Sequence, residues 1–109
     1  MSTVTTHVLD TALGQPAAGV PVRLERPGEA GPVAEGVTNA DGRIGDLGPD
    51  GLAPGVYRIV FGTGAYFARD GRHAFYPEVV VTFLVEEGGG HYHVPLLVSS
   101  YSCTTYRGS

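Results

Sequence analysis

The chain contains 109 residues, of which 42% are hydrophobic, and it carries a net charge of -4. This length suits a single domain, expected to span residues 1–109, and the hydrophobic share excludes a disordered tail. The acidic balance argues against a nucleic-acid partner, and no apolar run is long enough to cross a membrane. No signal peptide is visible and the single cysteine, Cys103, fits a reducing compartment, so we expect a cytoplasmic protein.

Short apolar segments separated by glycine- and proline-rich turns predict an all-β chain. In chain order, we expect strands over residues 4–9, 20–24, 33–38, 56–61, 79–85, 91–99 and 103–106. One short helix is expected over residues 63–69 with Thr63 as its N-cap, and residues 86–90 are expected to form a hairpin turn. Strands at this spacing are typical of an antiparallel β-sandwich.

The strand expected over residues 91–99 has two faces of different character, because successive side chains of a strand point to opposite sides. The apolar face is the natural core and consists of Tyr92, Val94, Leu96 and Val98. The mixed face suits a cleft lined by more than one subunit and consists of His91, His93, Pro95 and Leu97. Cys103 has no catalytic setting in the sequence, so we expect a small buried apolar residue there.

Histidines and one arginine are the candidate functional residues. His91 and His93 share a strand face, and His7 lies in the first expected strand. A neutral imidazole can accept a proton from water or bind zinc, but no acidic residue or cysteine at ligand spacing supports a zinc site. Arg43 follows the Asp41-Gly42 turn, and its planar guanidinium could hold a carboxylate or stabilise an oxyanion. Taken alone, each side chain is more simply explained as a surface or structural residue.

Four segments, taken together with the end of the chain, carry a resemblance to a known family. The segments are residues 6–11 (THVLDT), 38–43 (TNADGR), 75–79 (FYPEV) and 91–99 (HYHVPLLVS), and the chain closes on Tyr106-Arg107-Gly108-Ser109. The set resembles the 5-hydroxyisourate hydrolase family, the transthyretin-related proteins, in order and over essentially the whole chain. The closing tetrapeptide is the mark that separates this family from true transthyretins.

The resemblance implies a fold, an assembly and a reaction. The fold is a transthyretin-like sandwich of two four-stranded sheets, and the assembly is a homotetramer with active sites at the dimer–dimer interface. The reaction is the hydrolytic opening of the six-membered ring of the small molecule 5-hydroxyisourate, a product of urate oxidation. Its product is 2-oxo-4-hydroxy-4-carboxy-5-ureidoimidazoline, and the family implies no cofactor and no metal.

The family's functional positions carry over to residues at both ends of this chain. The catalytic set falls on His7, Arg43, His93 and Ser109, the substrate-binding set on His7, Arg43 and Tyr106, and the supporting set on Arg107 and Gly108. We expect His7 to take a proton from water, His93 to position water or the ring, and Arg43 to stabilise developing negative charge. The Ser109 hydroxyl or a terminal carboxylate is expected to orient a histidine or the water.

Two departures from the family pattern and three alternatives stay open. Ser100 replaces a proline and Cys103 replaces a tyrosine, changes that affect packing and remove no catalytic group. A transthyretin-type ligand carrier would use the same sandwich, since a fold does not fix a function. A surface adhesion module would resemble residues 16–61, but it would not explain the histidines or the closing tetrapeptide. A zinc-binding protein is the third alternative.

Overall fold

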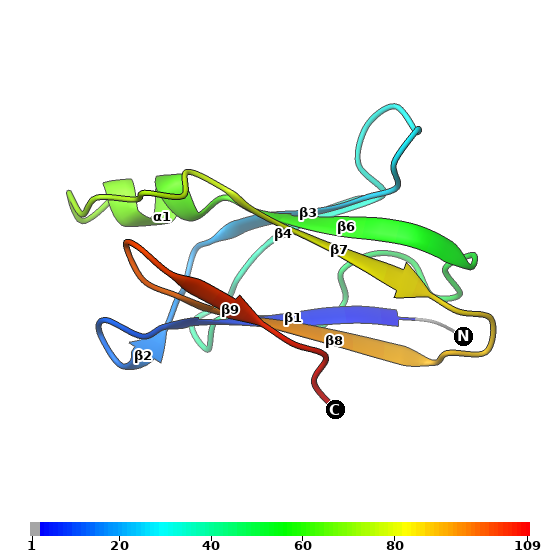
Figure 1. Ribbon diagram of the computed structural model, residues 1–109. Coiled ribbons are helices and arrows are strands. Elements are labelled where there is room, and N and C mark those ends of the chain that lie inside the picture. Colours follow the sequence, from blue (N-terminus) through cyan, green and yellow to red (C-terminus); the bar gives the residue numbers. More distant parts are fainter. Residues whose placement is uncertain (1–2) are drawn as a thin grey trace.

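The computed structural model describes residues 3–109, which form two stacked β-sheets and one short helix (Figure 1). The first sheet contains β1 (Thr3–Asp10), β2 (Gln15–Pro16), β5 (Arg43–Ile44), β8 (His91–Val98) and β9 (Cys103–Thr105). The second sheet contains β3 (Pro21–Glu25), β4 (Ala34–Val37), β6 (Gly55–Phe61) and β7 (Val79–Val85). The expected all-β sandwich is therefore confirmed.

The pairing of β1 with β8 differs from the antiparallel arrangement that the spacing predicts. These strands run parallel over their whole length, from Thr3 opposite His91 to Asp10 opposite Val98. The remaining strand pairs of the described chain are antiparallel. Parallel strands need a long crossover connection, and here the chain between the end of β1 and the start of β8 forms it.

Two connections also differ from the sequence-based expectation. Residues 86–90 do not close a hairpin, because β7 and β8 belong to different sheets, and the segment carries the chain from one layer to the other. The short strands β2 and β5 pair with successive parts of the same edge of β1. Each has only two residues, which is too short to show a hydrophobic period.

The helix α1 (Thr63–Ala68) is present, but Thr63 is not its N-cap. Gly62 occupies the cap position without a side-chain hydrogen bond, while the buried Thr63 hydroxyl donates to the Tyr76 carbonyl at 2.8 Å. The hydroxyl thus fastens the helix to the following loop. Among residues 3–109, no helix is long and apolar enough to span a membrane.

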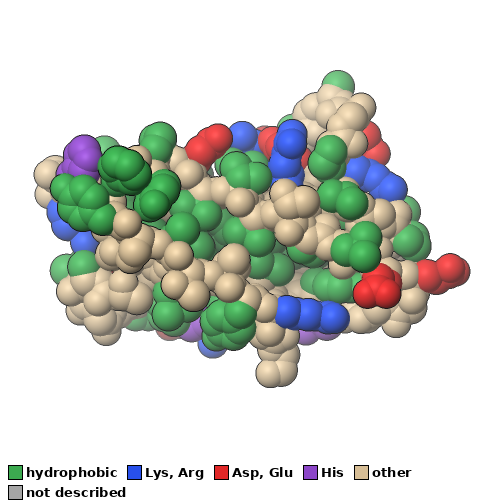
Figure 2. Space-filling model, viewed as in Figure 1, with side chains coloured by type: hydrophobic (Ala, Val, Ile, Leu, Met, Phe, Trp, Pro, Cys, Tyr) green, Lys and Arg blue, Asp and Glu red, His purple; other side chains and the backbone are tan. Residues whose placement is uncertain are grey.

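Cys103 is exposed rather than buried, contrary to the expectation for a lone apolar cysteine. The reason is its position in β9, which forms one edge of the first sheet and is exposed at every residue. Other exposed side chains gather at the helix end of the molecule, where Figure 2 shows a group of hydrophobic residues. The aromatic members of the exposed set include Phe75, Tyr76 and Tyr101, and the Phe75 ring lies beside each of the other two.

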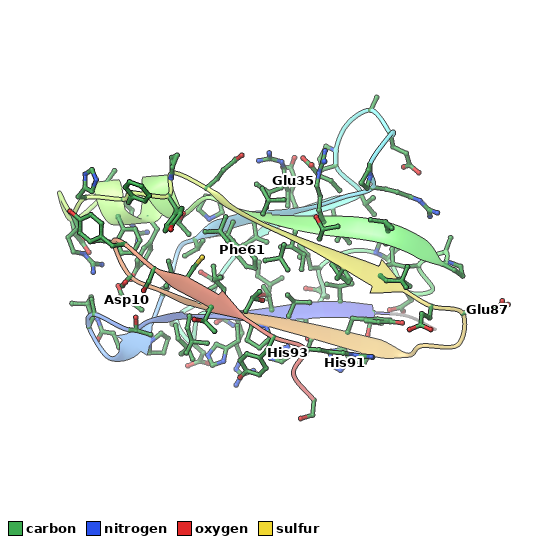
Figure 3. All side chains as sticks on the ribbon, in the orientation of Figure 1. Asp10, Glu35, Phe61, Glu87, His91 and His93 are labelled. Carbon is green, nitrogen blue, oxygen red and sulfur yellow. The ribbon has the colours of Figure 1, made fainter. Side chains whose placement is uncertain are left out.

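The core between the sheets follows the alternation expected from the sequence. Tyr92, Val94, Leu96 and Val98 are buried, as are Val22, Leu24, Tyr57, Ile59 and Phe61 from the second sheet. Figure 3 shows Phe61 between the two layers, with His91 and His93 on the opposite, outer side of β8. Each large apolar side chain contributes about 1.5–3 kcal/mol by leaving water.

A buried carboxylate joins the end of β1 to the segment after the helix. Asp10 is fully buried and accepts hydrogen bonds from the Tyr66 hydroxyl and from Arg72 Nη2, both at 2.8 Å. Its other oxygen accepts the backbone N–H groups of Ala12 and Leu13. Burial alone raises the pKa of Asp10, but the Arg72 and Tyr66 hydrogen bonds outweigh it and hold that pKa below its ordinary value.

We expect Asp10→Asn to lower the free energy of unfolding by about 1–3 kcal/mol at pH 7, because it removes a charge-assisted contact with Arg72. A carboxylate with a lowered pKa stabilises the fold above about pH 4 and loses this effect as pH falls further. The difference between variant and wild type should therefore shrink on acidification. Thermal unfolding at fixed protein concentration tests this, with Asp70→Asn as the control, because the Asp70 side chain also contacts Arg72 but is 53% exposed. Equal destabilisation by both variants would contradict the assignment.

Candidate active site

The register between β1 and β8 brings the first strand's outward side chains beside the histidines of β8. In β1 the buried residues are Val4, Thr6, Val8 and Asp10, so the intervening side chains point away from the core. Thr5 lies directly opposite His93, and His7 lies opposite Pro95. The Thr6 hydroxyl is turned inward and donates to the Val94 carbonyl at 2.6 Å, which ties the two strands together.

A tight turn places Arg43 in β5, which pairs with the edge of β1 opposite β8. The Asn39 side-chain oxygen accepts the backbone N–H groups of Asp41 and Arg43, at 2.9 and 3.0 Å. Gly42 has a φ of 75°, and a Cβ there would meet the Val8 carbonyl oxygen at 2.4 Å, so only glycine lets the turn approach β1. Arg43 consequently pairs in register with His7, and directly paired residues share a sheet face.

The closing residues continue along the edge of β8 with which β9 pairs, and Gly108 forms an isolated antiparallel bridge with His93. The Gly108 N–H donates to the His93 carbonyl at 2.8 Å, and a Cβ on Gly108 would lie 2.5 Å from His93 Cδ2. The Arg107 guanidinium covers the Tyr92 ring at 4.5 Å and reaches the His91 carbonyl at 3.3 Å. These contacts bring Ser109 beside the histidines.

A cavity of about 220 Å³ opens at this place on the outer face of the first sheet. Its lining residues are Thr5, Thr6, Arg43, Ile44, Gly45, His91, His93 and Ser109. A larger groove of about 380 Å³ lies on the second sheet between Val22, Glu35 and Val60, but no histidine lines it. The smaller cavity therefore holds the chemically capable side chains.

The structure brings together most of the residues predicted for the site. Arg43, His93 and Ser109 line the cavity, and His7 pairs with Arg43 beside it. Tyr106 instead lines a separate groove of about 300 Å³ with Phe83 and Tyr92, next to β7. Within one chain, the predicted substrate contact of Tyr106 is therefore not formed at this cavity.

Thr5 is a cavity residue that the sequence reasoning missed. Its hydroxyl oxygen lies 2.7 Å from His91 Nε2 and 2.7 Å from His93 Nδ1, so it joins the two imidazoles. The available signal was the strand period: Thr5 lies two residues before His7 and must share its face. His91, which is not among the functional positions carried over from the family, also lines the cavity.

The cavity favours the neutral form of His93. Burial lowers the pKa of His93 below its ordinary value, and the Arg43 guanidinium and the neighbouring imidazoles of His91 and His7 oppose protonation of its ring further. The ring therefore stays uncharged at neutral pH and can accept a hydrogen bond or a proton. Among residues 3–109 no ion pair includes Arg43, so its guanidinium charge has no carboxylate partner there.

Metal binding finds no support in the described part of the chain. No group of three or more histidine, cysteine, aspartate or glutamate side chains within residues 3–109 is arranged to hold a metal ion. The rings of His91 and His93 are 6.2 Å apart, and the cavity lining supplies no third ligand of these types. The arrangement suits hydrolysis, with the neutral His93 imidazole for the water and a guanidinium for developing negative charge.

Comparisons with known proteins agree with this chemistry. The model of the HIUase/Transthyretin family matches residues 4–108. The 5-hydroxyisourate hydrolase of Caulobacter vibrioides is 47% identical and covers 100% of both chains. That of Mus musculus is 45% identical and covers 99% of this chain and 96% of the mouse protein.

Solved structures give the same picture. Klebsiella pneumoniae 5-hydroxyisourate hydrolase superposes with a TM-score of 0.92 at 43% identity, covering 100% of both chains. Sea bream transthyretin in complex with thyroxine superposes with a TM-score of 0.88 at 33% identity, covering 97% of this chain and 94% of that chain. The relatives named 5-hydroxyisourate hydrolase, at 43–47% identity over nearly the full chain, show that this small β-sandwich is a hydrolase. The chain belongs to the HIUase/Transthyretin family.

We expect Arg43→Gln to raise the pKa of His93, because the substitution removes a positive charge that disfavours the imidazolium. Titration of the His93 ring by NMR measures this directly. Arg58→Gln is a matched control, since Arg58 contacts Glu25 on the other sheet and should leave His93 unchanged. An unaltered His93 titration in Arg43→Gln would show that the two groups do not interact as described.

Proposed function

We propose that this protein hydrolyses 5-hydroxyisourate, opening its six-membered ring to 2-oxo-4-hydroxy-4-carboxy-5-ureidoimidazoline in urate breakdown. The observation that carries the proposal is the cavity in which His93 and Arg43 meet beside His7. The relatives at 45–47% identity that bear this activity in their names support the choice of substrate. The reaction needs no group beyond water and the chain's own side chains.

Hydrolysis of a cyclic amide needs an activated water, a stabilised oxyanion and a proton for the departing nitrogen. We assign proton removal from water to His7, while neutral His93 accepts a hydrogen bond from the same water and fixes its position. The water oxygen bonds to the ring carbonyl carbon, and the ring carbon–nitrogen bond then breaks. The proton held by His7 passes to the departing nitrogen, and Arg43 faces the negative charge on the carbonyl oxygen.

The closing residues have supporting roles in this mechanism. We assign orientation of the water or of His93 to the Ser109 hydroxyl, because Ser109 lines the same cavity. Gly108 allows the chain to pass close to the His93 ring, and Arg107 holds the segment against Tyr92. We assign a substrate contact to Tyr106 in the assembled protein, since in its own chain it lies in another groove.

We further propose a cytoplasmic homotetramer with active sites at the dimer–dimer interface. The cavity lies on the outer face of a sheet, where a second subunit can close it. The strands β7 and β9 are sheet edges, and edges offer unpaired backbone groups to a second chain. The exposed aromatic rings of Phe75, Tyr76 and Tyr101 supply further apolar surface.

Light scattering at micromolar concentration should therefore report a mass close to four protomers of 11.4 kDa. The expected reason is that a cavity with one open side binds substrate poorly until a partner subunit covers it. Dilution series that compare mass with specific activity provide the stronger test. Full activity in a monomeric fraction would contradict a shared site.

The function is tested by following the ultraviolet absorbance of 5-hydroxyisourate, generated in place by urate oxidase, with and without the protein. The substrate also decays unaided, so the blank rate is the reference. Decay should accelerate in proportion to protein concentration and persist in the presence of a chelator. If the folded tetramer leaves the decay rate equal to that of the blank, the proposal is refuted and a ligand carrier is favoured.

In the same assay, His7→Ala and Arg43→Ala should each lower kcat/KM by at least about 100-fold, because each removes a group that acts on the reacting atoms. Arg58→Ala is the matched control, since it removes a surface arginine of the other sheet. Circular dichroism confirms that each variant is folded. Near-normal turnover in a folded His7→Ala or Arg43→Ala protein would remove that residue from the mechanism.

A further inference from the structure

The Thr5 hydroxyl occupies a place between two imidazoles that the proposed reaction does not by itself explain. It lies at 2.7 Å from both His91 Nε2 and His93 Nδ1, and these distances are those of strong hydrogen bonds. Thr5 and His93 are directly opposite in the β1–β8 register, so the backbone ladder fixes their spacing. A threonine side chain is also restricted at χ1, which keeps its hydroxyl in place.

A hydroxyl carries a single proton, and this limits how the three side chains share their hydrogens. If Thr5 donates to His91, its oxygen accepts from His93, and the His93 proton must then sit on Nδ1. If Thr5 donates to His93 instead, the His93 proton must sit on Nε2. The two arrangements differ in the ring nitrogen that His93 presents away from Thr5.

We propose that Thr5 is a positioning residue that keeps the His93 proton on Nδ1 and leaves Nε2 bare to accept a hydrogen bond from water in the cavity. Its consequence for catalysis rests on the proposed function, in which His93 accepts such a bond. His91 completes the arrangement by accepting the Thr5 proton. The role parallels that of the acid that fixes a catalytic imidazole in hydrolase triads, with a hydroxyl in place of the carboxylate.

The surroundings of His93 leave its Nε2 open to the cavity. Within the described residues, no hydrogen bond from the protein reaches Nε2, and the ring lines the cavity. Gly108 packs against the Cδ2 edge of the ring so closely that a Cβ would collide with it, which restricts rotation of the ring. The ring nitrogen opposite Thr5 is therefore the one available to the cavity.

The charges around His93 oppose its protonation, and Thr5 acts in the other direction. The charged and titratable side chains that act on it are Arg43 from β5, His7 from β1 and His91 from β8. These groups and burial lower the pKa of His93, and a backbone hydrogen bond of Thr5 raises it. When the Thr5 hydroxyl oxygen accepts from Nδ1–H, this side-chain bond acts in the same direction as the backbone bond. Such a bond stabilises a ring that has accepted a proton, as expected if oxygen accepts from Nδ1–H.

The test compares Thr5→Val with Thr5→Ser in the full-length protein. Valine keeps the shape and the strand preference but removes the hydroxyl, while serine keeps the hydroxyl and removes the methyl group. Two readouts are needed: the 15N chemical shifts of the His93 ring, which report the protonated nitrogen, and the kinetics of 5-hydroxyisourate decay. Thermal unfolding confirms that both variants are folded.

Thr5→Val should move proton occupancy of His93 from Nδ1 toward Nε2 and lower the pKa of the ring. It should reduce kcat by about twofold to tenfold with a smaller change in KM, which is the expected scale for a hydrogen bond between neutral groups. Thr5→Ser should keep the wild-type ring spectrum and most of kcat. Removing the acceptor with His91→Phe should shift the ring spectrum in the same direction as Thr5→Val.

The two readouts separate failure of this inference from failure of the proposed function. A His93 spectrum that is unchanged in Thr5→Val overturns the inference, whatever the activity. An equal loss in Thr5→Ser and Thr5→Val overturns it as well, since the methyl group and not the hydroxyl would then matter. If the wild type does not accelerate 5-hydroxyisourate decay, the proposed function fails, while the spectrum still decides whether Thr5 sets the tautomer.

Discussion

The parallel pairing of β1 with β8 is the contact on which both the core and the cavity depend. On one face it buries Val4 and Val8 together with alternate residues of β8, and on the other it sets Thr5 against His93. Because the side-chain period of a strand is two, a slip of one residue would turn His93 inward and expose the core. The apolar face therefore enforces the register that the cavity requires. Stability and site geometry are in this way consequences of the same ladder.

This arrangement explains how one fold serves chains with different functions. The outer face of the first sheet adds little to the core, so its side chains can change without unfolding the sandwich. Sea bream transthyretin, named for its complex with thyroxine, superposes with a TM-score of 0.88. In the present chain the outer face carries His7, Arg43 and His93, and none of them has a structural ion pair among residues 3–109. Titratable and charged groups without a carboxylate partner point to chemistry rather than to packing.

The sequence predicts the strands and the helix better than it predicts which strands pair with each other. Alternation identified the inward face of β8, because periodicity is a local property. The parallel β1–β8 pair and the crossover at residues 86–90 could not be predicted from local sequence patterns, because they depend on which layer each strand joins. The resemblance to a family placed His7, Arg43 and His93, yet the role of Thr5 needed distances between strands from opposite ends of the chain. Exposure of Cys103 likewise follows from the edge position of β9.

The charge of the cavity lining differs from the charge of the chain as a whole. The chain carries a net charge of -4, but the cavity lining contains Arg43 and two histidines and no aspartate or glutamate side chain. The positive charge of Arg43 suits a carbonyl-rich substrate that becomes negative as water adds to it. Burial, together with the same charge, keeps His93 neutral, which preserves its ability to accept a hydrogen bond. A carboxylate placed to orient His93 would weaken both effects, because it would neutralise Arg43 and favour the imidazolium. An uncharged hydroxyl, as in Thr5, can orient the ring without either cost.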